Sequence, residues 1–292
     1  MNPYSIILSA DLSTRDELIK VAKATLPYID GIKIHLSSLI FWGYQIINDL
    51  ITSKILKDKI LILDLKISDI GFLSLDGKFE GSNAKILEAV ADLTPEIDNV
   101  FVTIHGFPGP VSIKECIEVG HKNDIKLLLI PYMSHVGADV FFDVKCGTKE
   151  EKEKYTKYGM IHSPDYQQTI SETILSLGEL YGVDGYIGPS NNLNVLHAYR
   201  RITQKVIVSP GFGRQANGVP FERQFYSWAK EVGPNSMAII GSMIYKASNC
   251  HEVANYVKRI RDAFIDDISN SEPEWIVEGK VTKKEIPFRL ED

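Results

Sequence analysis

The chain has 292 residues, of which 44% are hydrophobic and 24% are charged, and its formal net charge is −6. A chain of this size can form one sizeable hydrophobic core or two smaller ones, so we expect a globular protein. The negative net charge excludes a general electrostatic attraction to nucleic acid polymers or to anionic membranes, while a local basic site for one phosphate stays compatible with it.

The cysteines Cys116, Cys146 and Cys250 are scattered, without the CxxC spacing of a zinc site or a disulfide framework. This pattern favours a reducing compartment. Residues 1–4 lead directly into an apolar run without the basic segment of a secretory signal. No window approaches the roughly 18 apolar residues that a bilayer span needs. We therefore expect a cytoplasmic protein that does not enter membranes.

Eight short apolar runs along the chain have the length and composition of buried parallel strands. They cover residues 5–10, 31–34, 59–63, 100–104, 127–130, 185–187, 205–208 and 237–240. Segments with helical periodicity separate most of them, at residues 14–26, 84–91, 112–119, 169–180 and 250–264. Strict alternation of strands and helices predicts an α/β fold, with a (β/α)8 TIM barrel as the first choice and an open doubly wound sheet as the second.

Two segments depart from this alternation. Residues 71–83 predict a hairpin around Asp76-Gly77, and residues 141–163 contain a mixed-charge run that is typical of a solvated helix face. We therefore predict a single barrel domain over residues 1–265 with these two insertions, followed by a C-terminal extension over residues 266–292.

Charged side chains gather at the end of the third run, where Asp64 and Lys66 are followed by Asp69. Side chains two apart in a strand face the same way, so Asp64 and Lys66 are expected to project together. An ion-paired cap that closes the strand is the structural alternative. A ligand site is favoured, because parallel sheets bind ligands at the carboxyl ends of their strands.

The D-x-K-x-x-D pattern of Asp64, Lys66 and Asp69 resembles the orotidine 5'-monophosphate decarboxylase superfamily, and in particular its archaeal-type enzymes. Further stretches match in the same order along the chain. They are Leu8-Ser-Ala-Asp11, Gly31-Ile-Lys33-Ile, His105-Gly-Phe-Pro-Gly109, Met133-Ser-His-Val-Gly-Ala138, Gly188-Pro-Ser190, Ser209-Pro-Gly-Phe-Gly-Arg-Gln215 and Gly241-Ser-Met-Ile-Tyr245. The similarity covers roughly residues 5–264.

The resemblance implies decarboxylation of orotidine 5'-monophosphate to uridine 5'-monophosphate in pyrimidine biosynthesis, without a cofactor or a metal. It implies a catalytic network of Lys33, Asp64, Lys66 and Asp69, in which Asp69 enters the site of the neighbouring subunit of a homodimer. Asp64 would repel the substrate carboxylate, and Lys66 would stabilise and protonate the carbanion that remains. Lys33 would orient Asp64 and reach a ribose hydroxyl.

The resemblance also implies a set of substrate-binding residues. Asp11 would bind the ribose, Ser134 the pyrimidine amide edge, and Gln215 would link base and phosphate. Backbone groups around three glycines would hold the phosphate. The whole set is Asp11, Ser134, Pro189, Gly211, Gly213, Arg214, Gln215, Gly241 and Ser242.

One position departs from the family pattern, because Ser242 stands where an arginine normally grips the phosphate. Arg214 would compensate from the preceding loop, or the chain would be a divergent decarboxylase with another substrate. A non-catalytic nucleotide-binding paralogue is a further alternative.

A metal-dependent branch of the superfamily acts on sugar phosphates with magnesium and has a glutamate near the end of its second strand. This chain has Lys33 in that stretch, and an ammonium there would repel Mg²⁺. The histidines His35, His105 and His135 lack metal-binding spacing, and we interpret them as hydrogen-bonded structural residues.

Overall fold

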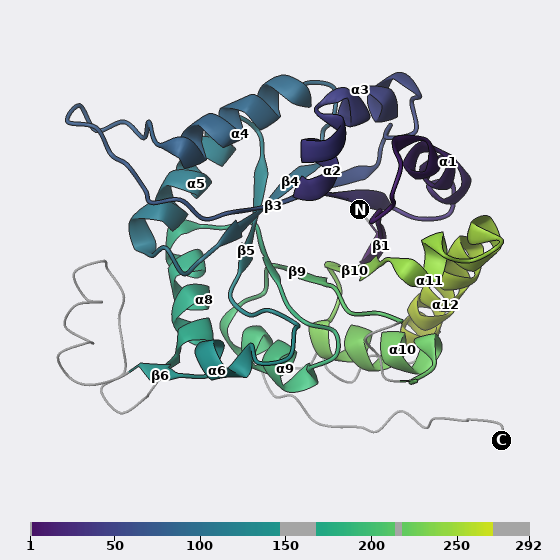
Figure 1. Cartoon of the computed structure of the whole chain (residues 1–292). Helices are drawn as coiled ribbons and strands as arrows, with labels where there is room; N and C mark the ends of the chain where they lie inside the picture. Colours follow the sequence, from purple (N-terminus) through teal and green to yellow (C-terminus); the bar gives the residue numbers. More distant parts are fainter. Residues whose placement is uncertain (1, 147–167, 214–217, 271–292) are drawn as a thin grey trace.

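The computed structural model describes residues 2–146, 168–213 and 218–270, and eight parallel strands close into a barrel in the order β1-β10-β9-β8-β5-β4-β3-β2 (Figure 1). The strands are β1 (Tyr4–Ser9), β2 (Gly31–His35), β3 (Ile60–Ile67), β4 (Val100–His105), β5 (Lys126–Ile130), β8 (Gly185–Ile187), β9 (Val206–Ser209) and β10 (Ser236–Ile240). Every predicted strand is confirmed. Because β1 pairs with both β2 and β10, the barrel is correct and the open sheet is wrong.

Helices surround the strands on the outside of the barrel (Figure 1). They are α1 (Arg15–Thr25), α2 (Leu36–Trp42), α3 (Gln45–Thr52), α4 (Ser82–Leu93), α5 (Pro110–Lys122), α6 (Asp139–Phe142), α8 (Ile170–Tyr181), α9 (Leu193–Ile202), α10 (Phe221–Val232), α11 (Ser242–Tyr245) and α12 (Cys250–Asn270). Local sequence explains several of their ends. Thr14 caps α1 by accepting from the backbone of Glu17, and Thr169 forms a capping box with Glu172 at the start of α8.

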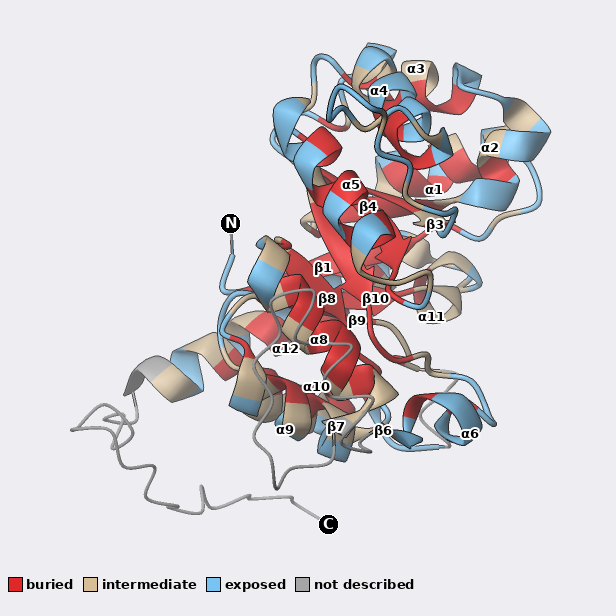
Figure 2. Ribbon diagram, turned by 90° about the vertical axis from the view of Figure 1, so that its left-hand side faces the viewer, coloured by how far each residue is buried: buried red, intermediate tan, exposed pale blue. Residues whose placement is uncertain are grey.

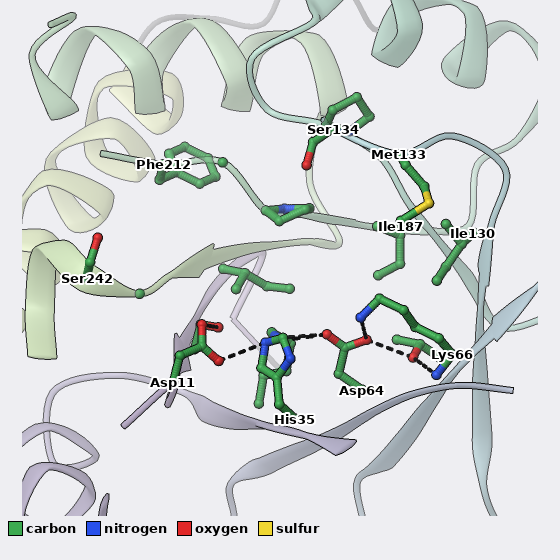
Figure 3. Close-up of a pocket in the computed structure, with 18 of the residues that line it drawn as sticks. Asp11, His35, Asp64, Lys66, Ile130, Met133, Ser134, Ile187, Phe212 and Ser242 are labelled. Atoms are coloured by element: carbon green, nitrogen blue, oxygen red, sulfur yellow. Dashed lines mark hydrogen bonds and ion pairs between the residues drawn. The ribbon is translucent and has the colours of Figure 1, made fainter. Parts of the chain in front are cut away.

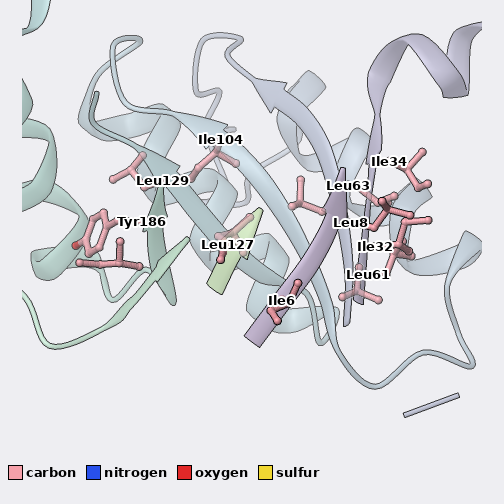
Figure 4. Close-up of a cluster of buried hydrophobic side chains, with 14 of the residues drawn as sticks. Ile6, Leu8, Ile32, Ile34, Leu61, Leu63, Ile104, Leu127, Leu129 and Tyr186 are labelled. Carbon is pink, nitrogen blue, oxygen red and sulfur yellow. The ribbon is translucent and has the colours of Figure 1, made fainter. Parts of the chain in front are cut away.

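The core has two layers, because successive strand residues point to opposite faces. Ile6, Leu8, Leu61 and Leu63 point outward and pack under the helices (Figure 4). The residues that alternate with them in the same strands, Ile7, Ile60 and Ile62, point into the barrel. The inner cluster comprises Ile7, Ile60, Ile62, Phe101, Leu128, Ile130, Ile187, Val206, Val208, Met237 and Ile239. Buried residues accordingly occupy the strands and the inward faces of the helices (Figure 2).

The first insertion forms the predicted hairpin, with one antiparallel bridge between Leu73 and Phe79 rather than two full strands. Gly77 has a φ of 79° at its tip, which explains the Asp-Gly turn. We call residues 70–81 the β3 hairpin.

The second insertion is bracketed by β6 (Lys145–Cys146) and β7 (Gln168–Thr169), which pair in antiparallel fashion. Residues 147–167, which carry most of the predicted charged run, lie outside the described residues. At the C-terminus α12 continues through Asn270, so residues 266–270 extend the last barrel helix. The rest of the predicted C-terminal extension lies outside the described residues. Within the described ranges, no helix combines the length and the apolar character needed to cross a bilayer.

Candidate active site

A cavity of about 340 Å³ opens at the carboxyl ends of the barrel strands (Figure 3). Strand alternation explains its charged floor. Ile60 and Ile62 point into the barrel, so Asp64 is the next inward residue of β3, and Lys33 is paired in register with Ile62. The cavity is lined by Ser9, Asp11, Lys33, His35, Asp64, Lys66, Thr103, Ile130, Tyr132, Met133, Ser134, Ile187, Pro189, Pro210, Gly211, Phe212, Ile239, Gly241, Ser242 and Tyr245.

Asp64 lies between two ammonium groups. Its Oδ2 is 2.8 Å from Lys33 Nζ, and its Oδ1 is 2.7 Å from Lys66 Nζ. Lys33 and Asp64 are almost fully buried, at 5% and 8% exposure. Charges are buried at this level when they are paired and hydrogen-bonded, which both of these are. The predicted projection of Asp64 and Lys66 into one site is therefore confirmed.

A bulge in β3 sets the position of Lys66. Between Leu63 and Ile67 the register with β4 shifts, and Lys66 has a φ of 51°, in the left-handed region. Thr103 of β4 fixes this geometry, because its hydroxyl accepts from Lys66 N at 2.9 Å and donates to Asp64 Oδ1 at 3.0 Å. Thr103 was not predicted from the sequence, because no motif distinguishes it from an ordinary inward strand residue.

His35 extends the charged chain toward Asp11. Its Nε2 lies 2.8 Å from Asp11 Oδ1 and 3.6 Å from Asp64 Oδ2, and it also contacts Lys33 Nζ. The ring is hydrogen-bonded, as we expected of a structural histidine, yet it also lines the cavity. Its site position was therefore missed, although its place two residues after Lys33 in the same strand was the signal that could have found it.

The pKa values of the buried groups reflect this pairing. Burial opposes ionisation of Asp64, but the charges of Lys33 and Lys66 outweigh it and hold the pKa of the carboxyl far below its usual range. Burial lowers the pKa of the Lys33 ammonium, and attraction to Asp64 only partly offsets it. For Asp11, burial is likewise outweighed, chiefly by the His35 hydrogen bond and the Lys33 charge, so its pKa is lowered.

The opposite wall of the cavity is mostly apolar. Ile130, Met133, Ile187 and Phe212 line the cavity together with the charged residues (Figure 3), and Ile239 adds to the apolar lining. A flat, uncharged ring could therefore pack there while its reacting group meets the ammonium and carboxylate groups.

The loop after β9 carries two glycines with positive φ, Gly211 at 110° and Gly213 at 78°. Buried Gln224 of α10 holds this loop, accepting from Gly213 N at 3.1 Å and donating to Gly211 O at 2.9 Å. Gly211 and Phe212 line the cavity, and Gly213 is the next residue along the chain. Arg214 and Gln215 lie outside the described residues.

A model of the orotidine 5'-phosphate decarboxylase / HUMPS family matches residues 4–257. The chain belongs to this family. An orotidine 5'-phosphate decarboxylase of Methanosphaera stadtmanae is 26% identical over 246 residues, covering 84% of this chain and 91% of the relative. One of Methanocaldococcus jannaschii is 24% identical over 255 residues, covering 87% and 97%.

Solved decarboxylase structures share the fold. The M. jannaschii enzyme complexed with inhibitor BMP has a TM-score of 0.65 at 23% identity, covering 89% of this chain and 99% of that one. The Pyrococcus horikoshii enzyme has a TM-score of 0.64 at 22% identity, covering 87% and 98%. These likenesses support the barrel.

Most of the site residues expected from the decarboxylase family meet in the one cavity. Lys33, Asp64, Lys66 and Asp11 form its charged side, and Ser134, Pro189, Gly211, Gly241 and Ser242 lie around the rest of its lining. Ser242, at the family's arginine position, opens the short helix α11.

Asp69 does not line this cavity. The Asp69 side chain is exposed. The pKa of its carboxyl is lowered mainly by a hydrogen bond with the Ser82 side chain and, to a smaller extent, by one from the backbone N–H of Ile70. Three hydrogen bonds hold the backbone of Asp69. Asn83 Oδ1 accepts from Asp69 N at 3.2 Å, and Asn83 Nδ2 donates to Asp69 O at 3.0 Å. Ser112 Oγ donates to the same carbonyl oxygen at 2.7 Å.

The other two histidines lie outside the lining. His105 is buried at the end of β4, and its Nδ1 lacks a hydrogen-bond partner among the described residues, contrary to our expectation for that nitrogen. Burial, and then the charge of Lys66, lowers the pKa of the His105 ring. His135 is exposed in the loop after β5.

The metal-dependent branch of the family would need oxygen ligands at the end of β2. There Lys33 is bonded to Asp64, and among the described residues no group of three or more His, Cys, Asp and Glu side chains could hold a metal ion.

Proposed function

We propose that the chain catalyses metal-independent decarboxylation of orotidine 5'-monophosphate to uridine 5'-monophosphate, a step of pyrimidine biosynthesis. The observation that carries this proposal is the Asp64 carboxylate between the ammonium groups of Lys33 and Lys66, at 2.8 and 2.7 Å, in one cavity. Family membership supports the reaction class, and the relatives named above are themselves orotidine 5'-phosphate decarboxylases.

The arrangement suits a reaction that loses an anionic group and leaves a carbanion. With the substrate carboxylate next to Asp64, two unit charges about 4 Å apart repel by roughly 4 kcal/mol at an effective dielectric of about 20. The repulsion disappears as the bond from C6 to the carboxyl carbon breaks and CO2 departs. The electron pair stays on C6, and Lys66 then donates a proton to form the new C–H bond.

The remaining lining suits the rest of the nucleotide. We assign the ribose hydroxyls to Asp11 and Lys33, and the pyrimidine amide edge to Ser134 beside Pro189. We assign the phosphate to the loops around Gly211, Gly213, Gly241 and Ser242. Arg214 and Gln215 belong to the same assignment from sequence alone.

We further propose that the chain acts as a homodimer in which Asp69 completes the neighbour's site. Exposed apolar side chains gather in α2 and in the loops after β3 to β5, the same end of the barrel as the cavity. Phe41 is 80% exposed and Ile70, next to Asp69, is 74% exposed. An apolar face of this kind is typical of a protein interface.

A cytoplasmic location is also proposed, since the described cysteines Cys116 and Cys250 are free thiols.

The direct test follows pyrimidine absorbance after orotidine 5'-monophosphate is added, with and without a chelator. We expect turnover in both cases. Lys66→Ala should lower kcat by about 10⁴-fold or more, since it removes both carbanion stabilisation and the proton donor, while uridine 5'-monophosphate still binds. Turnover that requires added Mg²⁺ would contradict the proposal.

Ser242 favours one competing function, a nucleotide-binding paralogue, because the cavity lacks a guanidinium at the family's phosphate position. Tight binding of uridine 5'-monophosphate without turnover by the wild-type chain would support it.

The shared site has its own test, in which Lys66→Ala and Asp69→Ala homodimers are mixed and allowed to exchange subunits. A mixed dimer then contains one site with both residues intact. Activity should return on mixing. Lack of recovery in a mixture that has demonstrably exchanged would show that Asp69 does not serve the neighbour.

A further inference from the structure

A buried carboxylate lies behind Asp69 and has no role in the function proposed above. Glu115 of α5 is 0% exposed. A buried carboxylate is costly unless its oxygens are hydrogen-bonded, so its partners indicate what it does. No salt bridge involves Glu115 within the described part of the chain.

The partners of Glu115 are three N–H groups from the segment that follows β3. Its Oε1 accepts from Gly81 N at 3.0 Å, and its Oε2 accepts from Phe72 N at 3.3 Å and from Asn83 Nδ2 at 3.0 Å. Phe72 and Gly81 are at the two ends of the β3 hairpin. One carboxylate therefore ties both stems of this hairpin to α5.

The hairpin stems are shaped to this contact. A Cβ at Gly81 would lie 2.7 Å from Glu115 Oε1, and a Cβ at Gly71 would lie 2.5 Å from the backbone carbon of Val111. Only glycine allows the stems to come so close to α5 at these positions. The stems of the hairpin therefore lie against α5, and the hairpin projects outward on the side of α4 and α5 (Figure 1).

The same carboxylate orients the side chain that holds Asp69. Asn83 is 0% exposed, and its amide bonds both backbone groups of Asp69. Because Glu115 accepts only from the NH2 side of that amide, it fixes which end of Asn83 faces the N–H of Asp69. A glutamine at position 115 keeps only one acceptor oxygen, so its NH2 group would face at least one of these N–H donors where the glutamate offers an acceptor.

We propose that Glu115 is a positioning residue for the reaction, acting through Asn83 to fix the backbone of Asp69 and anchoring the β3 hairpin to α5. The catalytic part of this inference rests on the proposed decarboxylation, while the anchoring part is independent of it. Asp69 immediately precedes the hairpin, so a looser anchor displaces its carboxylate without altering any group in the cavity.

A double-mutant cycle tests the catalytic part. Glu115→Gln preserves shape, and Asp69→Asn removes the charge while preserving the backbone bonds to Asn83. With Asp69 present, Glu115→Gln should lower kcat by about tenfold and leave KM within about twofold. In the Asp69→Asn background, measured under single-turnover conditions, it should change the rate less than about twofold, because coupled residues are not additive.

Equal losses in the two backgrounds would reveal a general structural defect and overturn the positioning role, and so would an unchanged kcat. Glu118→Gln is the matched control, since Glu118 is an exposed residue of α5 that pairs with Lys114 at 3.4 Å. It should match the wild type in every assay.

Amide hydrogen exchange tests the anchor without any turnover. Peptides covering residues 69–81 should exchange at least tenfold faster in Glu115→Gln than in the wild type or in Glu118→Gln, while peptides from β3 stay unchanged. Unaltered exchange would overturn the anchor. A wild-type chain without turnover would instead overturn the proposed function, and the exchange result would still decide the anchoring role.

Discussion

The two walls of the cavity differ in how their chemistry is built. On the side of β1 to β3, a continuous chain of hydrogen bonds and ion pairs links Asp11, His35, Lys33, Asp64 and Lys66 (Figure 3). On the side of β5 to β10 the lining is mainly apolar side chains and glycines, with two serines and two tyrosines. The charged wall is set by strands in register, and the other wall mainly by loops. The reacting group should therefore be controlled by rigid strand residues, and ligand identity by loop residues.

After Lys66→Ala, the next largest effect is expected from Asp64→Asn, because it breaks the charged wall at its centre. A neutral amide cannot repel a substrate carboxylate or balance two ammonium groups. We expect kcat to fall by about 10² to 10³-fold, the size for one preorganised electrostatic group, with a smaller change in KM. Steady-state kinetics measure both. Equal changes in kcat and KM for this variant would contradict the separate roles of the two walls.

Ser242→Arg tests the loop side. A guanidinium at this position should add a charge-assisted contact to a phosphate worth about 1.5 to 3 kcal/mol, or about 10 to 150-fold in affinity. Calorimetric titration with uridine 5'-monophosphate measures it, with uridine as the ligand without a phosphate and Ser242→Ala as the control variant. No gain for the nucleotide over the nucleoside would mean that the phosphate lies elsewhere.

Thr103→Val should lower kcat by about tenfold. The change removes a hydrogen bond to a carboxylate, which is worth about 1.5 to 3 kcal/mol, and leaves Lys66 N without its acceptor. Thr103→Ser keeps the hydroxyl and should retain near wild-type rates. If serine is as slow as valine, packing of the methyl group rather than the hydrogen bond controls this position.

The pH profile gives the smallest and most gradual effect. Burial lowers the pKa of Lys33, so its ammonium should lose its proton below the ordinary lysine value of about 10.4, and kcat/KM should decline there. In this window the unfolded chain binds more protons at Lys33, so the contribution of Lys33 to the free energy of unfolding rises with pH.

Comparing wild type with Lys33→Met isolates that contribution in denaturant titrations. Activity that falls while this contribution rises indicates titration of Lys33. A joint fall of both quantities would instead indicate alkaline unfolding.

The alternation of strands and helices was sufficient to rank the barrel above an open sheet, and each continuous buried run such as Ile60 to Leu63 needs a parallel neighbour on either side. The two-residue period of a strand also predicted that Asp64 and Lys66 share a site. It could not predict the bulge that places Lys66, nor the support from Thr103, since both depend on contacts between strands distant in sequence. The role of Glu115 could not be predicted either, because a glutamate on a helix is usually exposed and its partners lie far away in the sequence.

Five residues other than glycine have positive φ among those described, and four of them, Lys54, Asp58, Asp124 and Asn235, occupy turns. Lys66 alone of these sits within a barrel strand. Such a conformation costs roughly 1 to 2 kcal/mol for a side chain with a Cβ. A screen for heat-resistant variants that ignores activity should therefore enrich glycine or asparagine at this position and discard the lysine that we propose as the proton donor. Thermal robustness and turnover are then in direct competition at a single residue.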